Sequence, residues 1–79
     1  MNRIKEVLEE KGIKQTWLAD RLGKSYNIVN GYVQNRQQPR LEILYQIAVI
    51  LEVEISELLI EKAKHLAEAE SKYKFNKKI

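Results

Sequence analysis

Two asparagines three residues apart, Asn27 and Asn30, carry the side chains in this chain best suited to a specific polar contact. A carboxamide presents a donor beside an acceptor, which is the pattern that N6 and N7 of adenine require in the major groove of DNA. Asparagine is a mediocre helix former, so two of them within four residues of a helical segment favour base contacts over plain surface polarity. Tyr26, just before them, could contact a thymine methyl group or donate to a phosphate.

Residues for catalysis or metal binding are scarce. The 79 residues include no cysteine, a single histidine (His65) and no glycine-rich phosphate loop. Disulfides and thiolate metal sites are excluded and no nucleophile–base constellation is present, so we expect no enzyme activity, no metal, no cofactor and no small-molecule ligand. No run of about 18 apolar residues occurs, and the N-terminus lacks a basic-then-apolar signal sequence. We therefore expect a cytoplasmic protein without a membrane segment.

The net charge of +3 is unevenly spread along the chain. Residues 14–40 hold five basic residues against one acidic residue, a net +4, whereas residues 41–60 hold four glutamates and no basic residue. Residues 61–79 return to a net +3. A polyanion would therefore meet the middle segment, while the acidic segment faces elsewhere. Charge alone leaves an ordinary solvated surface open as an alternative.

The elements that must position these residues are helices. Apolar residues recur with the 3.6-residue period through the first 60 residues, and no stretch alternates as a strand would. The pattern predicts a compact all-α fold of five short helices with brief connections. Asn2 and Ser25 are placed to cap the first and third helices, and Gly12 and Gly23 to end the first and second. The expected core faces are Ile4, Val7 and Leu8; Leu18, Ala19 and Leu22; Val29, Tyr32 and Val33; Leu41, Leu44, Ile47, Ala48 and Leu51; and Ile55, Leu58 and Leu59.

Two parts of the chain differ in this pattern. Residues 1–60 are predicted to form one domain, and residues 61–79 a C-terminal extension that is helical at first and then disordered. The extension carries six lysines, which could add attraction to phosphates.

Residues 15–34 combine the constraints of a helix-turn-helix. Ala19 is small where two helices must approach, Gly23 follows where a tight turn needs positive φ, and Val29 and Tyr32 can pack the third helix on the second. Residues 3–60 resemble the Cro/C1-type (XRE-like) helix-turn-helix family of phage repressors and bacterial regulators, whose domain is lambda-repressor-like. The resemblance is carried by Gly12-Ile13-Lys14-Gln15, Leu18-Ala19, Leu22-Gly23-Lys24-Ser25, Pro39-Arg40-Leu41-Glu42, Ile47-Ala48 and Leu51-Glu52-Val53.

The resemblance implies that the third helix lies in the major groove with its first residues at the base edges. On its exposed face we expect Tyr26, Asn27, Asn30 and Gly31 to contact bases, the bare Gly31 standing where relatives often place a side chain. Gln15 would hold a phosphate at the start of the second helix. Arg40, just after the loop proline, resembles residues that some phage repressors place in the minor groove. The further residues expected at the DNA backbone are Lys24, Ser25, Gln34, Asn35, Arg36 and Arg40.

Two positions depart from the family pattern. Leu8 and Val33 stand where relatives often pair an arginine with a glutamate, and an apolar pair can replace an ionic one at no cost in stability. Asn35 stands where glycine usually ends the third helix, and asparagine tolerates the left-handed conformation better than most residues. Both departures are compatible with an intact domain.

The sequence thus predicts a transcriptional regulator that binds an operator in double-stranded DNA as a homodimer. The expected dimer surface consists of Ile55, Leu59, Ile60, Ala63 and Leu66, although some of these must close the monomer core. The alternative is an antitoxin-like or other protein-interaction module that binds a partner through residues 61–79. The operator and the sign of regulation are not encoded in any recognisable motif.

Overall fold

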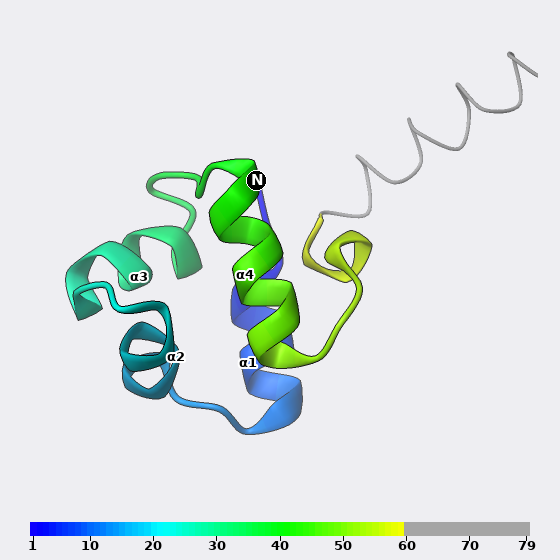
Figure 1. Cartoon of the computed structure of the whole chain (residues 1–79), viewed down its shortest axis with the longest axis horizontal. Helices are drawn as coiled ribbons and strands as arrows, with labels where there is room; N and C mark the ends of the chain where they lie inside the picture. The colour runs from blue at the N-terminus through cyan, green and yellow to red at the C-terminus, as the bar shows by residue number, and fades with distance from the viewer. Residues whose placement is uncertain (60–79) are drawn as a thin grey trace, which may run out of the picture.

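The computed structural model describes residues 1–59, which fold into four α-helices and one 3₁₀ turn (Figure 1). The elements are α1 (Ile4–Lys11), α2 (Gln15–Leu22), α3 (Tyr26–Val33), α4 (Leu41–Leu51) and η1 (Ile55–Leu58). The all-α prediction is confirmed, but the expected fifth helix is a single 3₁₀ turn. Residues 60–79, and with them Ile60, Ala63, Leu66 and the extension that could bind a partner, lie outside the described residues.

The helix ends follow the sequence closely. Gly12 ends α1 and Gly23 ends α2, each with a φ of +66°, a conformation that glycine adopts without strain. Ser25 caps α3, as predicted: its Oγ accepts a hydrogen bond from the backbone N–H of Ile28 at 3.2 Å. The short connections between α1, α2 and α3 are therefore set by local residue chemistry.

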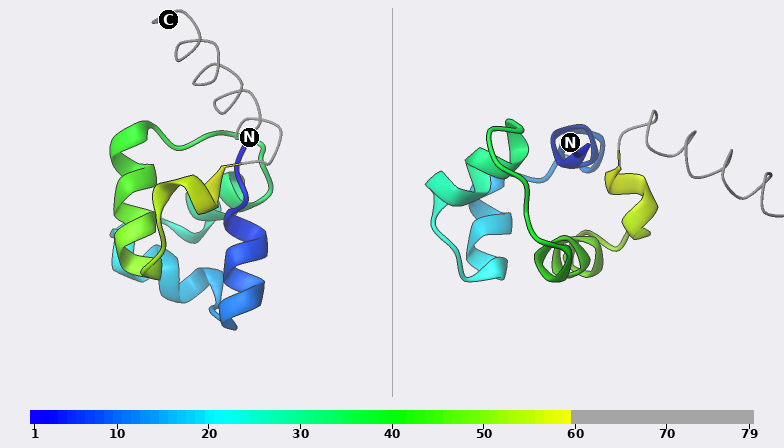
Figure 2. Two further views of the ribbon diagram at one scale, coloured as in Figure 1. Left: turned by 90° about the vertical axis from the view of Figure 1, so that its right-hand side faces the viewer. Right: turned by 90° about the horizontal axis from the view of Figure 1, so that it is seen from above.

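The five elements surround one apolar core. Seen from above, α1 and α4 lie on opposite sides, with the α2–α3 pair and η1 closing the other two (Figure 2). Ile4, Leu18, Val29, Ile47 and Leu58 are the most deeply buried apolar residues contributed by each of the five elements. Burial on this scale is what stabilises so small a domain. No helix among residues 1–59 is long and apolar enough to cross a membrane.

One predicted core residue is misplaced. Leu41, at the start of α4, is 61% exposed rather than buried. It begins a row with Tyr45 and Val49, spaced by one helical turn each, that faces solvent with exposed fractions of 54% and 74%. The residues that α4 does bury are Leu44, Ile47, Ala48 and Leu51. Because α4 is apolar on nearly every face, periodicity alone could not separate its buried face from its exposed row.

The segment before α1 has a larger structural role than capping. Asn2 is only 5% exposed, and its Nδ2 donates to the carbonyl of Tyr32 and to Oε1 of Gln38, both at 3.0 Å. Its Oδ1 accepts from the N–H of Ile4 at 3.0 Å, although the N-cap position itself is Arg3. Asn2 therefore ties the start of the chain to the end of α3 and the loop after it.

The loop after α3 is held by the same residue. The backbone N–H of Asn2 donates to Oδ1 of Asn35 at 2.8 Å, and Nδ2 of Asn35 donates back to the carbonyl of Asn2 at 3.2 Å. Asn35 has a φ of 58°, which confirms the predicted left-handed conformation. In that conformation its side-chain amide exchanges two hydrogen bonds with the backbone of Asn2, as a residue of a neighbouring strand would.

Candidate nucleic-acid interface

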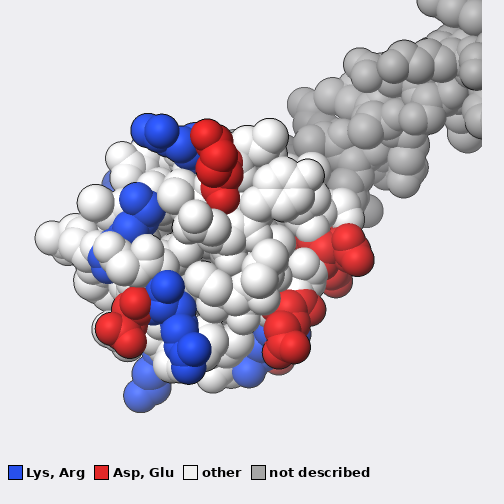
Figure 3. Space-filling view, in the orientation of Figure 1, with Lys and Arg blue, Asp and Glu red and all other residues white. Residues whose placement is uncertain are grey.

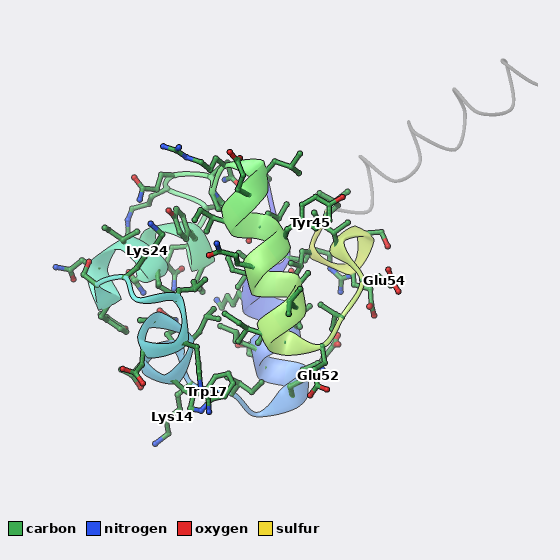
Figure 4. The ribbon with its side chains drawn as sticks, in the orientation of Figure 1. Lys14, Trp17, Lys24, Tyr45, Glu52 and Glu54 are labelled. Carbon is green, nitrogen blue, oxygen red and sulfur yellow. The ribbon has the colours of Figure 1, made fainter. Side chains whose placement is uncertain are left out.

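The α2–α3 pair has the geometry that its sequence predicts. Ala19 is buried where the two helices meet, and Val29 and Tyr32 are buried on the side of α3 that packs against the domain. Lys24, half-buried, lies in the turn between the helices (Figure 4). This packing leaves the opposite face of α3, beginning at its N-terminus, open to solvent.

The exposed face of α3 carries polar and apolar groups together. Tyr26 and Asn27 are exposed, as expected, and Ile28 beside them is 39% exposed. Asn27 and Ile28 line a shallow hollow with Gly31, Arg36 and Gln37, the last two contributed by the loop after α3. Neither Ile28 nor Gln37 was anticipated, because an isoleucine at a helical position normally indicates core and a loop glutamine carries no motif.

Gly31 lies on the same face of α3 as Asn27, but it is covered rather than exposed as predicted. It is buried, and a Cβ atom placed on it would lie 3.3 Å from Cγ of Gln37 and 3.5 Å from Cδ and Nε2 of that side chain. The N–H groups of Arg36 and Gln37 donate to the Gly31 carbonyl at 2.9 and 3.3 Å, which folds the loop back against α3. The Gln37 side chain therefore covers Gly31, which has no side chain of its own.

Asn30 joins three elements through its carboxamide. Its Nδ2 donates to Oε1 of Gln15 at 2.9 Å, and its Oδ1 accepts from Nη2 of Arg36. Arginine has no acceptor, so Oδ1 of Asn30 must face Arg36 and Nδ2 must face Gln15. Gln15 in turn presents its oxygen to Asn30, which leaves its Nε2 donor directed away from Asn30. The predicted site residues Gln15, Asn30 and Arg36 are thus brought together, with the Asn30 amide bonded at both ends.

The other residues expected at the DNA backbone fall into two groups. Ser25, Gln34 and Arg40 are exposed around α3, and Lys24 is half-buried in the turn. Asn35 differs, because both ends of its amide are bonded to Asn2.

Charge on the surface is divided in the way the sequence suggested. On the face shown in Figure 3, acidic side chains gather toward the end of α4 and η1, where Glu52 and Glu54 lie, whereas basic side chains are spread over the α2–α3 side. Two exposed acidic residues lie apart from that group, Asp20 in the basic segment 14–40 and Glu42 in the first turn of α4. The described residues contain no group of three potential metal ligands.

Leu8 and Val33, the apolar pair at the position of the family's ion pair, are 3% and 1% exposed and belong to one core cluster. Their interpretation as packing residues of α1 and α3 is confirmed. Trp17 lies at the surface of α2 near Ile13 (Figure 4). The Arg21 guanidinium stacks over its ring, 4.7 Å from the ring centroid.

The predicted dimer residues that are described, Ile55 and Leu59, are half-buried and pack against the monomer core. Their side chains therefore contribute to folding of the single chain. The exposed row of Leu41, Tyr45 and Val49 is the more accessible apolar surface.

Comparisons with known proteins agree with this geometry. A family profile described as helix-turn-helix, of the Cro/C1 type, matches residues 4–58. A solved structure of a candidate DNA-binding protein from Bacteroides fragilis is 41% identical to the chain, with a TM-score of 0.72 over 73% of this chain and 94% of that one. None of the curated proteins matches. The chain belongs to the Cro/C1-type helix-turn-helix family of DNA-binding transcriptional regulators.

Proposed function

We propose that this protein regulates transcription by binding an operator with the N-terminal half of α3 in the major groove. The observation that carries the proposal is the arrangement around Asn30. An exposed polar helix face is flanked by two side chains that keep further N–H donors, Gln15 and Arg36, both held by one carboxamide. The similarity to a candidate DNA-binding protein supports the same function.

Tyr26 and Asn27 are the proposed base-contacting residues, since both are exposed in the first turn of α3. The free amide of Asn27 can bond to adenine N6 and N7, and the exposed Ile28 adds an apolar surface suited to a thymine methyl group. Together they would give the half-site its sequence preference.

Asn30, which the sequence suggested as a base-contacting residue, is better suited to orienting its neighbours. Its Nδ2 already donates to Gln15 and its Oδ1 already accepts from Arg36, so an adenine would have to share or displace these two partners. Left as it is, the amide keeps Nε2 of Gln15 and the remaining N–H groups of Arg36 available for other acceptors. We therefore place Asn30 in the interface as a positioning residue.

The proposed phosphate contacts surround α3. Gln15 opens α2, whose N-cap Lys14 makes no side-chain hydrogen bond, so the first N–H groups of α2 have no side-chain acceptor. Helix N-termini attract phosphate in this way. The remaining contacts would come from Lys24, Ser25, Gln34, Arg36 and Arg40, which are placed around the same helix. These contacts orient the domain and carry no base preference.

A second copy of the chain is the proposed partner on the operator. Arg21 borders a hollow along the C-terminal half of α4 with Tyr45 and Val49, while Glu42 is exposed in the first turn of α4. If two α4 helices cross antiparallel about a two-fold axis, Arg21 faces Glu42 of the partner subunit, and the same pair forms twice. Ile55 and Leu59, being half-buried, would add less to such a dimer.

The function is tested by selecting bound duplexes from a random DNA pool and footprinting the selected sequence. We expect a palindromic site, because two copies read two half-sites. Asn27→Ala should lower affinity and flatten the preference at one base pair per half-site, by about 1–3 kcal/mol. Ser56→Ala, an exposed polar side chain on η1, is the control and should change nothing. Failure of the unsubstituted protein to enrich any sequence would contradict the proposal.

A further inference from the structure

We propose that Gln37, in the loop after α3, contacts an adenine in the major groove. Its side chain reaches the groove by packing over Gly31, which has no side chain of its own. The proposal rests on the DNA-binding function above and assigns a base contact to a residue outside the recognition helix.

The first observation is that nothing in the backbone requires glycine at position 31. Gly31 lies inside α3 and is not among the residues with positive φ, which are Gly12, Gly23, Asn35 and Glu52. Glycine inside a helix is unfavourable compared with alanine. What its missing side chain allows is close packing of Gln37, whose Cγ lies 3.3 Å, and whose Cδ and Nε2 lie 3.5 Å, from where a Cβ would stand.

The second observation is the location of that space. Gly31 is one helical turn beyond Asn27, so a side chain there would extend the row that begins with the proposed base contact. Gln37, Asn27 and Ile28 line the same hollow on the face of α3. The Gln37 carboxamide therefore stands beside the groove-facing residues although the chain reaches it six positions after Gly31.

The third observation is that the amide is available. Both ends of the neighbouring Gln38 amide are bonded, to Nδ2 of Asn2 and to Oδ1 of Asn35. The Gln37 amide is exposed, and none of the hydrogen bonds among residues 1–59 involves it. A free glutamine amide offers the donor–acceptor pair that matches N7 and N6 of adenine.

The test uses the full chain and compares base preferences selected from a random DNA pool. Gln37→Ala should weaken the preference for adenine at one position of the half-site by about 5- to 150-fold and leave the other positions unchanged. The affinity of this variant should depend on salt concentration as strongly as that of the unsubstituted protein does, because an amide releases no counterions. Ser56→Ala on η1 is again the control.

Two further measurements separate a base contact from a structural effect. Gly31→Ala should weaken the same adenine preference, because its Cβ would lie 3.3 Å from Cγ of Gln37 and shift that side chain by a few tenths of an ångström, while the helix itself becomes no less stable. Replacing that adenine with 7-deazaadenine, which lacks the N7 acceptor, should weaken binding of the unsubstituted protein but not of Gln37→Ala.

The outcomes are distinct. If the unsubstituted protein selects a sequence but Gln37→Ala keeps the same base preferences, or loses affinity equally for all sequences, the Gln37 contact is wrong and the regulator function stands. A preference for another base at the affected position overturns the adenine assignment. If the unsubstituted protein selects no sequence, the regulator function fails, and the Gln37 contact fails with it.

Discussion

Replacement of Asn30 by alanine tests whether this residue orients the interface or contacts a base. The substitution removes the acceptor that holds Arg36 and the donor that holds Gln15. Both long side chains would then have to be immobilised when DNA binds, at about 0.5–1.5 kcal/mol each. Their sum, about 1–3 kcal/mol, corresponds to a rise in Kd of about 5- to 150-fold.

That magnitude cannot decide the question alone, because loss of one base contact costs about the same, 1–3 kcal/mol. The pattern across sequences can. A positioning residue acts through phosphate contacts, so Asn30→Ala should weaken binding to the operator, to each single-base variant of it and to unrelated DNA by a similar factor. Fluorescence anisotropy titrations over a series of salt concentrations would measure this.

The substitution should leave the fold intact. Two partly exposed hydrogen bonds are worth about 0.5–1.5 kcal/mol each at most, and alanine returns part of this through its higher helix propensity. A melting curve followed by circular dichroism provides the check. If Asn30→Ala instead abolished the preference at one base pair and left binding to unrelated DNA unchanged, the orienting role would be refuted and the base contact restored.

Asn30→Asp sharpens the same test. A carboxylate can still accept from Arg36, but it has no donor for Oε1 of Gln15, so Gln15 must turn its Nε2 inward and its oxygen outward. An outward oxygen and an added negative charge both repel phosphate, so this variant should bind DNA more weakly than Asn30→Ala. Equal affinities of Asn30→Asp and the unsubstituted protein would show that the direction of the Gln15 amide is irrelevant.

Three further substitutions test other parts of the structure. Val33→Glu buries an unpaired carboxylate and should destabilise the domain by about 3–5 kcal/mol, with stability partly restored by adding Leu8→Arg; no restoration in thermal denaturation would contradict their packing. Asn2→Ala leaves the buried N–H of Ile4 without its acceptor and should cost about 1–3 kcal/mol, lowering the melting temperature by about 4–8 °C per kcal/mol. Val49→Glu should convert the dimer to a monomer in sedimentation experiments, and a dimer that survives would exclude the α4 interface.

The features that sequence predicted best are those set by one residue and its immediate neighbours. Positive φ at Gly12 and Gly23, the Ser25 cap and the left-handed Asn35 all follow from local chemistry, and all are found. Leu41 shows the limit of periodicity, since a helix with apolar residues on several faces does not say which of them meets the core. The sequence predicts a helix where the structure has the 3₁₀ turn Ile55–Leu58, because so short an apolar segment does not distinguish the two.

The parts of the site that sequence missed depend on contacts between distant segments. The sequence predicts an Asn30 amide free to contact a base, because its partners, Gln15 and Arg36, come from another helix and from a loop. Gly31 seemed exposed because nothing in the sequence places Gln37 over it. Exposure of a polar group on an isolated helix is therefore a weak guide to its availability once loops fold back on that helix.

The loop after α3 shows how the missed contacts fit together. Asn35 and Gln38 are bonded to Asn2, so the N-terminal segment fixes the two ends of a four-residue stretch. Between them, Arg36 and Gln37 extend outward, to Asn30 and over Gly31 respectively. The buried Asn2 thus determines where two proposed DNA contacts stand, although it lies away from them in sequence. Asn2→Ala should consequently weaken DNA binding even at temperatures where the domain remains folded, whereas a purely structural asparagine would alter the melting temperature alone.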